Sequence, residues 1–469
     1  MEFAKKGMRV ELNRRKFMAG ATAMSLVPSV GRAATAPPTL EAKPGRVRLI
    51  TAEFGDYPET EIWGFGGGVP GPMIRARQGD VLQRRLVNNL PQPTSVHWHG
   101  LRVPNAMDGV PGMTQDAVAQ GGEFLYELPL KDAGTYWYHS HNQSTEQVAR
   151  GLYGVLIVDE EQPPEVDHDV TIVLDDWRLS KKAQITDDFG AMHDWTHAGR
   201  MGNYIHAHLA PQISTVEQNQ RLRLRFVNVA TDRIMSVSLN GVAGKIVARD
   251  GMPLETLETP EVMVFGPAER ADLIVDVTAA VGETVQLVIH ERDTGYLLEE
   301  IEVTGQHAKT PRGPVPRLPG NPIERLTDLK AARSVPLNME GGAMGGLRQG
   351  KYKGRVMSPQ ELVREGQIWT FNGEVGLPEA PLITAQRGET IRIPMQNNTV
   401  FPHAMHLHGT HFQEVLPDGT FGPLKDTILM DARETREIAF VADNPGDWLL
   451  HCHMLSHQAA GMKTWLRVT

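Results

Sequence analysis

The side chains with the most evident chemistry in this sequence are its histidines, and many of them occur in pairs. With 18 histidines among 469 residues, chance would place roughly 0.7 His-x-His pairs. Five pairs occur: His97/His99, His139/His141, His206/His208, His406/His408 and His451/His453. On a β-strand the two members of a pair face the same side, about 6.6 Å apart along the chain. Separate hydrogen-bonded histidines would explain one such pair, whereas this many pairs favour metal binding.

The only cysteine, Cys452, stands between two of these histidines in HCHMLSHQAAGM (451–462). A single cysteine can form no intramolecular disulfide, so its thiol is free for another role. The strand period turns Cys452 to the face opposite both neighbouring histidines, so one strand can serve two metal centres. His457 and Met462 follow at five-residue intervals. A distant His403 would complete a set of two imidazoles, a thiolate and a weak axial thioether, which is the ligand field of a blue copper site. Zinc fits less well, because structural zinc usually takes several cysteines and catalytic zinc keeps a water position open.

The elements that must position these side chains are β-strands. Alternating apolar and polar residues occur between turn residues in VLQRRLVNNL (81–90), EFLYELPL (123–130), RLRLRFVNVA (221–230), MVFGPAERADLIVDV (263–277) and TIRIPMQNN (390–398). Helical periodicity is scarce, and 46 glycines and 32 prolines supply the turns. These patterns predict an all-β protein built from β-sandwiches.

A weak internal repeat indicates how many sandwiches there are. RQGDVLQRRLVNNL (77–90), EQNQRLRLRFVNVA (217–230) and QRGETIRIPMQNNT (386–399) lead into SVHWHG, SVSLNG and AMHLHG respectively. The spacing between the three copies matches domains of ordinary size, and only the first and third copies end in His-x-His. We therefore expect a first domain over 40–160, a second without copper ligands over 165–305, a proline-rich linker over 306–335, and a third domain over 336–469.

Four ordered motifs give the sequence a family resemblance. HWHG (97–100), GTYWYHSH (134–141), HAMHLHG (403–409) and HCHMLSHQAAGM (451–462) resemble the copper motifs of three-domain multicopper oxidases, the class of laccases, ascorbate oxidases and cuprous oxidases. The resemblance runs from about residue 45 to 469 and implies three cupredoxin-like Greek-key β-sandwich domains. It also implies four copper ions, one of type 1, one of type 2 and two of type 3.

The resemblance implies, by motif position, which residues bind each copper ion. The implied ligands are His403, Cys452, His457 and Met462 for type 1; His97 and His406 for type 2; His99, His139 and His453 for one type 3 ion; and His141, His408 and His451 for the other.

The implied reaction couples four one-electron oxidations of a donor to the four-electron reduction of O₂ to water. Electrons would leave the type 1 site through Cys452 and reach the three-copper cluster by His451 or His453. Asp108, in AMDGVPG, stands where the family often has an acid near the type 2 ion, so it is either a proton relay or a turn-forming Asp-Gly. Many bacterial relatives have a further acid where this chain has Gln458, so the second proton path is open.

The donor is the least determined part of this prediction. Met462 as axial ligand favours a low-to-middle potential and easily oxidised donors, either phenolic or aromatic compounds or Cu(I). Thr399 and Phe401 stand where some cuprous oxidases have a carboxylate and a methionine, which slightly favours a laccase-like donor. A cuprous oxidase of copper tolerance is the alternative, and a non-catalytic copper-binding or cell-envelope scaffold protein is the alternative of another class. Copper nitrite reductases are typically shorter, two-domain chains without this set of paired histidines.

Two further groups of side chains have open roles. Met339 and Met344 lie in the glycine-rich NMEGGAMGG (338–346), where thioethers could capture Cu(I), although a plain loop is the simpler interpretation. An accessory metal site is the alternative to ordinary loop histidines for His206 and His208, with His193 and His197 nearby.

The N-terminus predicts the location of the protein. A twin arginine in NRRKFM (13–18) precedes an apolar run and small residues, which is typical of a Tat export signal over residues 1–33, with cleavage near Ala33 to Ala36. Removing this segment changes the formal charge from −9 to about −14. We expect a periplasmic monomer that meets the Tat translocase during export, has no membrane span, and binds no nucleic acid because basic runs are absent after the N-terminus.

Overall fold

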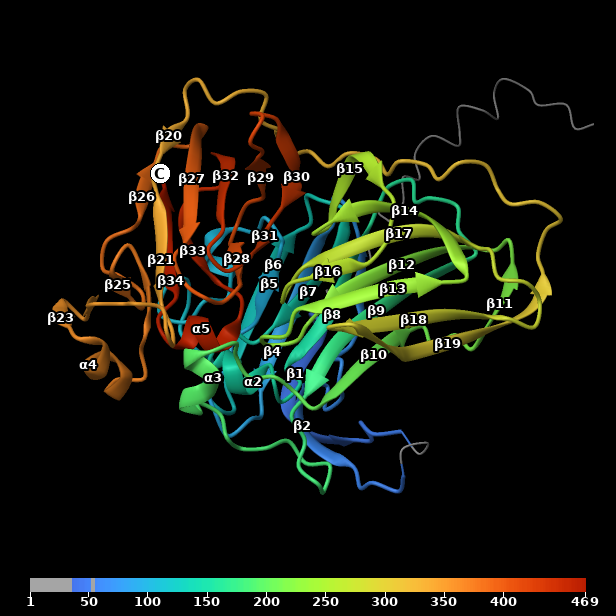
Figure 1. Cartoon of the computed structure of the whole chain (residues 1–469), viewed down its shortest axis with the longest axis horizontal. Helices are drawn as coiled ribbons and strands as arrows, with labels where there is room; N and C mark the ends of the chain where they lie inside the picture. Colours follow the sequence, from blue (N-terminus) through green and yellow to red (C-terminus); the bar gives the residue numbers. More distant parts are fainter. Residues whose placement is uncertain (1–35, 52–54) are drawn as a thin grey trace, which may run out of the picture. The chain divides into compact units, whose positions relative to one another are not determined.

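The computed structural model of the chain describes residues 36–51 and 55–469, and the expected export signal lies outside them. Residues Pro38–Thr469 form one compact unit, and its regular secondary structure consists mostly of β-strands (Figure 1). The described residues contain four short α-helices: α2 (Ser144–Gln147), α3 (Met192–Thr196), α4 (Pro359–Arg364) and α5 (Leu455–Ala459). No helix among these residues is both long and apolar enough to cross a membrane.

The strands fall into three consecutive groups, and each group forms two sheets. The first group has the strand orders β2-β1-β4-β6 and β3-β8-β7-β5. Its strands are β1 (Thr39–Val47), β2 (Thr60–Phe65), β3 (Ile74–Arg77), β4 (Val81–Asn88), β5 (His97–His99), β6 (Glu123–Pro129), β7 (Gly134–His139) and β8 (Tyr153–Asp159), with a 3-10 turn, η2 (Asn105–Met107), after β5.

The second, or middle, group has the orders β10-β9-β12-β17-β14-β15 and β11-β19-β18-β13-β16. Its strands are β9 (His168–Trp177), β10 (Tyr204–Ala210), β11 (Thr215–Gln218), β12 (Arg221–Asn228), β13 (Met235–Asn240), β14 (Val242–Arg249), β15 (Met252–Glu258), β16 (Met263–Phe265), β17 (Arg270–Val277), β18 (Thr284–Glu291) and β19 (Thr294–Gln306).

The third group has one sheet in the order β23-β22-β25-β24-β21-β27-β32-β29-β30, with β20 beside β27, and another in the order β26-β34-β33-β28-β31. Its strands are β20 (Arg333–Ser334), β21 (Leu337–Gly341), β22 (Gly350–Tyr352), β23 (Arg355–Met357), β24 (Trp369–Phe371), β25 (Glu374–Val375), β26 (Ile383–Ala385), β27 (Glu389–Asn397), β28 (His403–Leu407), β29 (Phe412–Val415), β30 (Phe421–Lys425), β31 (Thr427–Met430), β32 (Thr435–Ala442), β33 (Gly446–Cys452) and β34 (Lys463–Val468).

The same pairing scheme occurs three times. A parallel pair (β1/β4, β9/β12, β21/β27) builds one sheet of each group, and a second parallel pair (β3/β8, β11/β19, β26/β34) builds the other. The antiparallel pairs β5/β7, β13/β18 and β28/β33 correspond in the same way. In each group the chain passes repeatedly between the two sheets, which is the Greek-key connection of a β-sandwich. The prediction of three cupredoxin-like β-sandwiches is therefore confirmed, and the groups are called the first, middle and third domains below.

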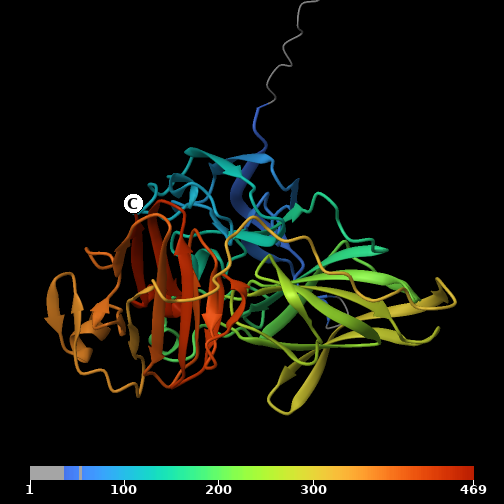
Figure 2. The same ribbon diagram turned by 90° about the horizontal axis from the view of Figure 1, so that it is seen from above.

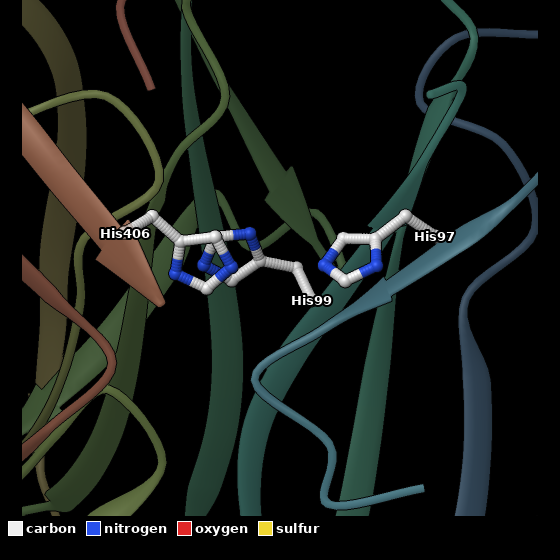
Figure 3. Close-up of side chains that lie close together, drawn as sticks. All are labelled: His97, His99 and His406. Atoms are coloured by element: carbon white, nitrogen blue, oxygen red, sulfur yellow. The ribbon is translucent and has the colours of Figure 1, made fainter. Parts of the chain in front are cut away.

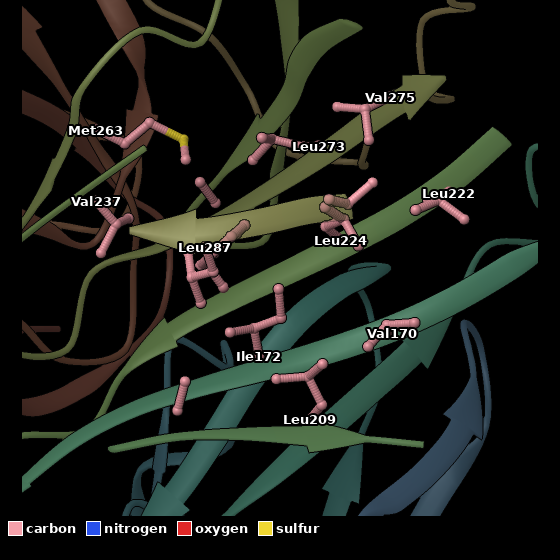
Figure 4. Close-up of a cluster of buried hydrophobic side chains, with 14 of the residues drawn as sticks. Val170, Ile172, Leu209, Leu222, Leu224, Val237, Met263, Leu273, Val275 and Leu287 are labelled. Atoms are coloured by element: carbon pink, nitrogen blue, oxygen red, sulfur yellow. The ribbon is translucent and has the colours of Figure 1, made fainter. Parts of the chain in front are cut away.

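Each domain encloses its own apolar core. The middle domain places side chains from both sheets face to face, among them Val170, Leu224, Val237, Leu273 and Leu287 (Figure 4). All five are less than 5% exposed, so alternation along the strands is what fills the space between the sheets. Figure 2 shows the three domains by their colours, with the connection between β19 and β20 running from the middle domain to the third.

Two of the predicted strands differ from the structure. Segment 263–277 is not one strand, because a turn separates β16 from β17. Strand β12, whose alternation predicts one exposed face, is buried along its whole length. Its arginines are buried because they pair with carboxylates: Arg223 binds Glu160 and Asp272, for example. A polar face packed against the first domain looks, in the sequence, like a face exposed to water.

Candidate metal centres

Four strands and the turns that follow them carry the paired histidines of the outer domains. Strand β5 pairs with β7 so that His97 lies opposite His139. In the third domain β28 pairs with β33 so that His406 lies opposite His451 and Met405 lies opposite Cys452. The two strand pairs face each other across the boundary between the first and third domains, since His453 Nε2 lies 3.4 Å from His139 Nε2.

The structure gathers these side chains into groups of potential ligand atoms, and within each group all the atoms lie within 4.8 Å of one another. Four of the groups consist of histidine and cysteine: His97, His99 and His406; His99, His139 and His453; His141, His408 and His451; and His403, Cys452 and His457. A fifth group contains His97, Asp108 and His408. Figure 3 shows His97 and His99 approaching from one side and His406 from the other. Every residue of these groups is buried. Two groups contain the same residues as the two type 3 sets that the resemblance implies. The group of His97 and His406 also includes His99, and the group of His403, Cys452 and His457 does not include Met462.

Hydrogen bonds to the far side of each ring decide which nitrogen is free. His408 Nδ1 donates to Asp108 Oδ2 at 2.9 Å, and His451 Nδ1 donates to the Cys452 carbonyl at 2.9 Å. Both Nε2 atoms therefore carry lone pairs, yet they face each other at 3.1 Å. Two acceptors at that distance repel unless a cation lies between them. The donor set thus fits a metal ion at this position.

Other imidazole rings of the cluster also have nitrogens that are free to bind a metal ion. The buried nitrogens without a hydrogen-bond partner include Nε2 of His97, His141 and His406, and Nδ1 of His99. Unpartnered buried polar atoms are costly, so a group of them aimed at one region fits the binding of a metal ion there. Neutral imidazole nitrogen suits copper, zinc, iron or nickel.

Asp108 lies at the edge of this cluster and is 1% exposed. Its backbone carbonyl accepts a hydrogen bond of 2.8 Å from His97 Nδ1, and its carboxylate accepts the bond from His408. Gly109 follows with φ of 83°, and a Cβ there would lie 1.8 Å from the Val96 carbonyl oxygen. Asp108 therefore belongs to a tight turn and also contacts two of the histidines.

A second buried carboxylate, Asp426, was not found from the sequence. Its Oδ1 accepts a hydrogen bond from His99 Nε2 at 3.1 Å, and its carbonyl accepts one from His406 Nδ1 at 2.8 Å. The Arg270 guanidinium, from the middle domain, binds both carboxylate oxygens at 2.8 and 2.6 Å. This arginine holds the pKa of Asp426 well below its ordinary value. Asp426 is thus a charged acceptor that fixes the orientation of two rings.

The Cys452 group lies on the opposite side of β33 from His451. Cys452 Sγ lies 3.6 Å from His403 Nδ1 and 3.8 Å from His457 Nδ1, and these two nitrogens are 3.1 Å apart. His403 Nε2 donates to Thr399 Oγ1 at 2.8 Å, and His457 Nε2 donates to the His197 carbonyl at 2.6 Å. Both Nδ1 atoms therefore carry lone pairs directed at each other and at the sulfur.

Burial sets the protonation of these groups. Removal from water lowers the pKa of seven imidazoles well below the ordinary value: His99, His139, His141, His403, His408, His451 and His453. It lowers the pKa of His457 to about 4 and raises the pKa of the Cys452 thiol. The imidazoles are therefore neutral ligands at pH 7, whereas the thiol needs a metal ion to displace its proton.

Met462 and the other candidate residues have different surroundings. Met462 is fully buried in the core of the third domain, together with Cys452. Met339 is also fully buried in that core and lies on β21. The interpretation of residues 338–346 as a plain loop is therefore wrong for Met339. Met344 is 79% exposed. Gln458, on α5, is buried.

The remaining histidine pairs lie outside the clusters. His193 lies within α3 and His197 follows its last residue, and their rings are stacked at 4.2 Å between centroids. His206 and His208 lie on β10 in the middle domain. Among the described residues, none of these four belongs to a group of three potential ligands.

Comparisons with known proteins agree with this geometry. Three family models described as multicopper oxidase match residues 46–163, 168–285 and 352–469. The chain is similar to multicopper oxidase MmcO of Mycobacterium tuberculosis, with 31% identity over 94% of this chain and 88% of the relative. This chain belongs to the multicopper oxidase family. It is accordingly a copper-binding oxidoreductase that couples oxidation of a reducing substrate to reduction of O₂.

Other relatives have diverse names. The copper resistance protein A homolog of Pseudomonas syringae is 26% identical over 86% of this chain and 88% of its own. Laccase-5 of Trametes villosa is 29% identical over 84% of each chain. A solved structure, Lac15 from a marine microbial metagenome, is 44% identical with a TM-score of 0.76 and covers 92% of this chain and 100% of its own. The relatives include both a protein named as a laccase and proteins named for copper resistance, so similarity alone does not resolve the substrate of this chain.

Proposed function

We propose that the clustered side chains hold four copper ions, as the family resemblance implies. His403, Cys452, His457 and Met462 would hold the type 1 ion and His97 and His406 the type 2 ion. The two type 3 ions would be held by His99, His139 and His453 and by His141, His408 and His451. The observation that carries this proposal is that lone pairs face one another, at 3.1 Å between His408 and His451 and at 3.1 Å between His403 and His457.

Copper, when bound, supplies one-electron acceptor sites and a place for O₂ to be reduced. The chain's contribution is to connect those sites. Cys452 belongs to one cluster, and its neighbours His451 and His453 belong to two others. With copper bound, these three consecutive residues would give an electron a short covalent route from the type 1 site to the O₂-reducing cluster.

The chain must also deliver protons to the reduced oxygen. Asp108 touches His408 and His97 and is the best-placed acid for this task. As a positioned carboxylate it can accept a proton and pass it into the cluster. Gln458 offers no acid, so Asp108 is the proton donor that we assign.

For the donor we favour phenolic or aromatic compounds over Cu(I). Thr399, where a copper-binding carboxylate would be useful, is buried and bonded to His403. Met339 is inside the core and cannot reach an incoming ion. Cuprous oxidation in copper tolerance remains the alternative, supported by exposed Met344 and by the name of the copper resistance relative. A non-catalytic copper-binding or scaffold role is a further alternative, which the complete ligand set disfavours.

We also propose that the enzyme works in the periplasm as a monomer after export by the Tat pathway. The support is the twin arginine of NRRKFM followed by an apolar run and small residues. Fusion of residues 1–36 to a reporter that is active only outside the cytoplasm tests this location. Replacing Arg14 and Arg15 by lysine should abolish export.

The function is tested by measuring O₂ consumption by the copper-loaded protein with a phenol and with Cu(I) in parallel. Turnover with the phenol and slower turnover with Cu(I) are expected. Faster turnover with Cu(I) would favour the cuprous oxidase, and no turnover with either donor while four copper ions are bound would favour the binding role.

A further inference from the structure

One of the five histidine pairs, His206 and His208, has no part in the clusters. Both residues lie on β10 of the middle domain, so they are strand residues and not loop histidines. Residues two apart on a strand face the same side. Ala207, between them, belongs to the apolar core of the domain. The two imidazoles therefore lie together on the outer face of their sheet, away from that core.

A pocket of about 670 Å³ lies along β10. This strand is at the end of the six-stranded sheet of the middle domain, and β19 of the other sheet contacts it there (Figure 1). The lining of the pocket includes His206 and His208 from β10, Gln212 just after it, and Glu299 from β19. Imidazole nitrogen and carboxylate oxygen are both ligands of divalent transition-metal ions. The pocket thus has the ligand types and the room for a metal ion with bound water.

The ring nitrogens of this pair are not used by the protein itself. Within residues 36–51 and 55–469, neither imidazole has a hydrogen-bond or ion-pair partner. The acid closest in register to His206 is Asp175, which lies opposite it on β9. That carboxyl accepts a hydrogen bond of 2.5 Å from the Tyr153 hydroxyl instead. The pair is therefore not explained as a structural hydrogen-bonded or charged contact.

Both imidazoles are neutral and can be reached from solvent. Burial, together with the nearby His208, lowers the pKa of His206 to about 4, and burial also lowers the pKa of His208. A neutral imidazole carries a lone pair that can bind a metal ion, whereas a protonated one does not. Each side chain is only partly buried, so an ion can enter without any movement of the strand.

We propose that His206 and His208 bind a divalent first-row transition-metal ion in this pocket, which we call the β10 site. It is separate from the four copper ions of the proposed function. Two imidazole nitrogens coordinate the ion and water fills the other positions, since three protein ligands do not converge there among the described residues. The ion therefore exchanges with the surroundings. Such sites bind Cu²⁺ ahead of Ni²⁺ or Zn²⁺, so Cu²⁺ is the expected occupant where copper is supplied.

Binding is tested by calorimetric titration with Ni²⁺. The protein carries no affinity tag, is loaded with copper so that the clusters are filled, and is washed with EDTA to remove exchangeable ions. We expect His206→Gln and His208→Gln each to weaken Ni²⁺ binding at least about tenfold, with the type 1 visible band and turnover unchanged. His290→Gln is the matched control, because His290 is a partly buried histidine of the same domain whose Nε2 lies 2.8 Å from Ser238 Oγ. It should bind Ni²⁺ as wild type does.

The position of the ion is measured in crystals of the copper-loaded protein soaked in Ni²⁺. Between the nickel and copper absorption edges, nickel gives a strong anomalous signal and copper a weak one. We expect a nickel peak about 2.1 Å from one nitrogen of each imidazole. Absence of Ni²⁺ binding, equal affinity in both glutamine variants and wild type, or a peak only elsewhere would overturn the β10 site. If Ni²⁺ binds there but the protein consumes no O₂ with any donor, the β10 site stands and the proposed oxidase function fails.

Discussion

The middle domain and its two neighbours share one pairing scheme but differ at the strand positions that carry the paired histidines. Where the first domain has His97 and His99 and the third has His406 and His408, the middle domain has Ser238 and Asn240. The four histidines are buried, whereas Asn240 is exposed and Ser238 is only partly buried. The position can bind metal only where two domains close over it, which the first and third domains do for each other.

The middle domain nevertheless supports both metal clusters from outside. Arg270 holds Asp426, which in turn orients His99. Asp232 accepts hydrogen bonds from the Ser456 backbone and hydroxyl at the start of α5, and the His197 carbonyl accepts one from His457. A domain that contributes no residue to the clusters can therefore still determine how the residues of its neighbours are placed.

The largest effect on turnover is expected when Cys452, in the third domain, is replaced. Replacing Cys452 by serine removes the thiolate that joins the clusters, so we expect the type 1 visible band to vanish and turnover to fall by at least about a thousandfold. Absorption spectra and O₂ consumption measure the two effects. Met405→Leu is the matched control, since Met405 is buried opposite Cys452 on β28 and should tolerate the change. Substantial turnover by the serine variant would refute the electron route through Cys452.

The next largest effect is expected when Arg270 of the middle domain is replaced. Arg270→Leu leaves Asp426 as a buried charge without its partner, which should lower the free energy of unfolding by about 3–5 kcal/mol. Urea denaturation of the copper-free protein measures this change, so the result is independent of metal binding. Arg46→Leu is the control, because the Arg46–Glu61 pair is mostly exposed and should contribute less than about 1 kcal/mol. Equal losses for the two variants would show that the middle domain does not support the cluster through Arg270.

A smaller effect is expected at the edge of the cluster in the first domain. Asp108→Asn keeps an oxygen that can accept from His408 but removes the acid. We expect turnover to fall about 10- to 100-fold while the type 1 band and the copper content stay normal. Asp116→Asn, at an exposed position of the same domain, should leave turnover unchanged. Wild-type turnover in Asp108→Asn would assign Asp108 to the turn alone.

The sequence predicts much of this structure because the ligands lie on short strands with a fixed period. The His-x-His spacing places both rings of a pair on one side, and the lone cysteine between two histidines predicts a strand that serves two centres. The threefold repeat predicts the three sandwiches, since each copy gives the same two strands, one in each sheet.

The parts that the sequence could not predict depend on contacts between domains. Asp426 and Arg270 are 156 residues apart and no spacing rule connects them. A signal was nevertheless present, because an aspartate directly before the strand that pairs with β28 is well placed to contact it. The arginines of β12 look like an exposed face because pairing with distant carboxylates leaves no local pattern.

The smallest expected effect is on the rate at which a phenol reduces the type 1 site, and it separates the contribution of α3 to this rate from that of general packing. Trp369→Phe keeps a ring beside His457 but removes the indole N–H that bonds to the Trp195 carbonyl. One lost hydrogen bond is worth about 1 kcal/mol, so we expect reduction of the type 1 site by a phenol to slow about fivefold. Anaerobic stopped-flow absorption at the type 1 band measures this rate. Trp465→Phe is the matched control, because it removes an indole N–H that bonds to the Pro378 carbonyl at 2.9 Å in the same domain. If both variants slow reduction equally, the effect belongs to the packing of the third domain; if only Trp369→Phe does, α3 of the middle domain belongs to the route by which electrons enter.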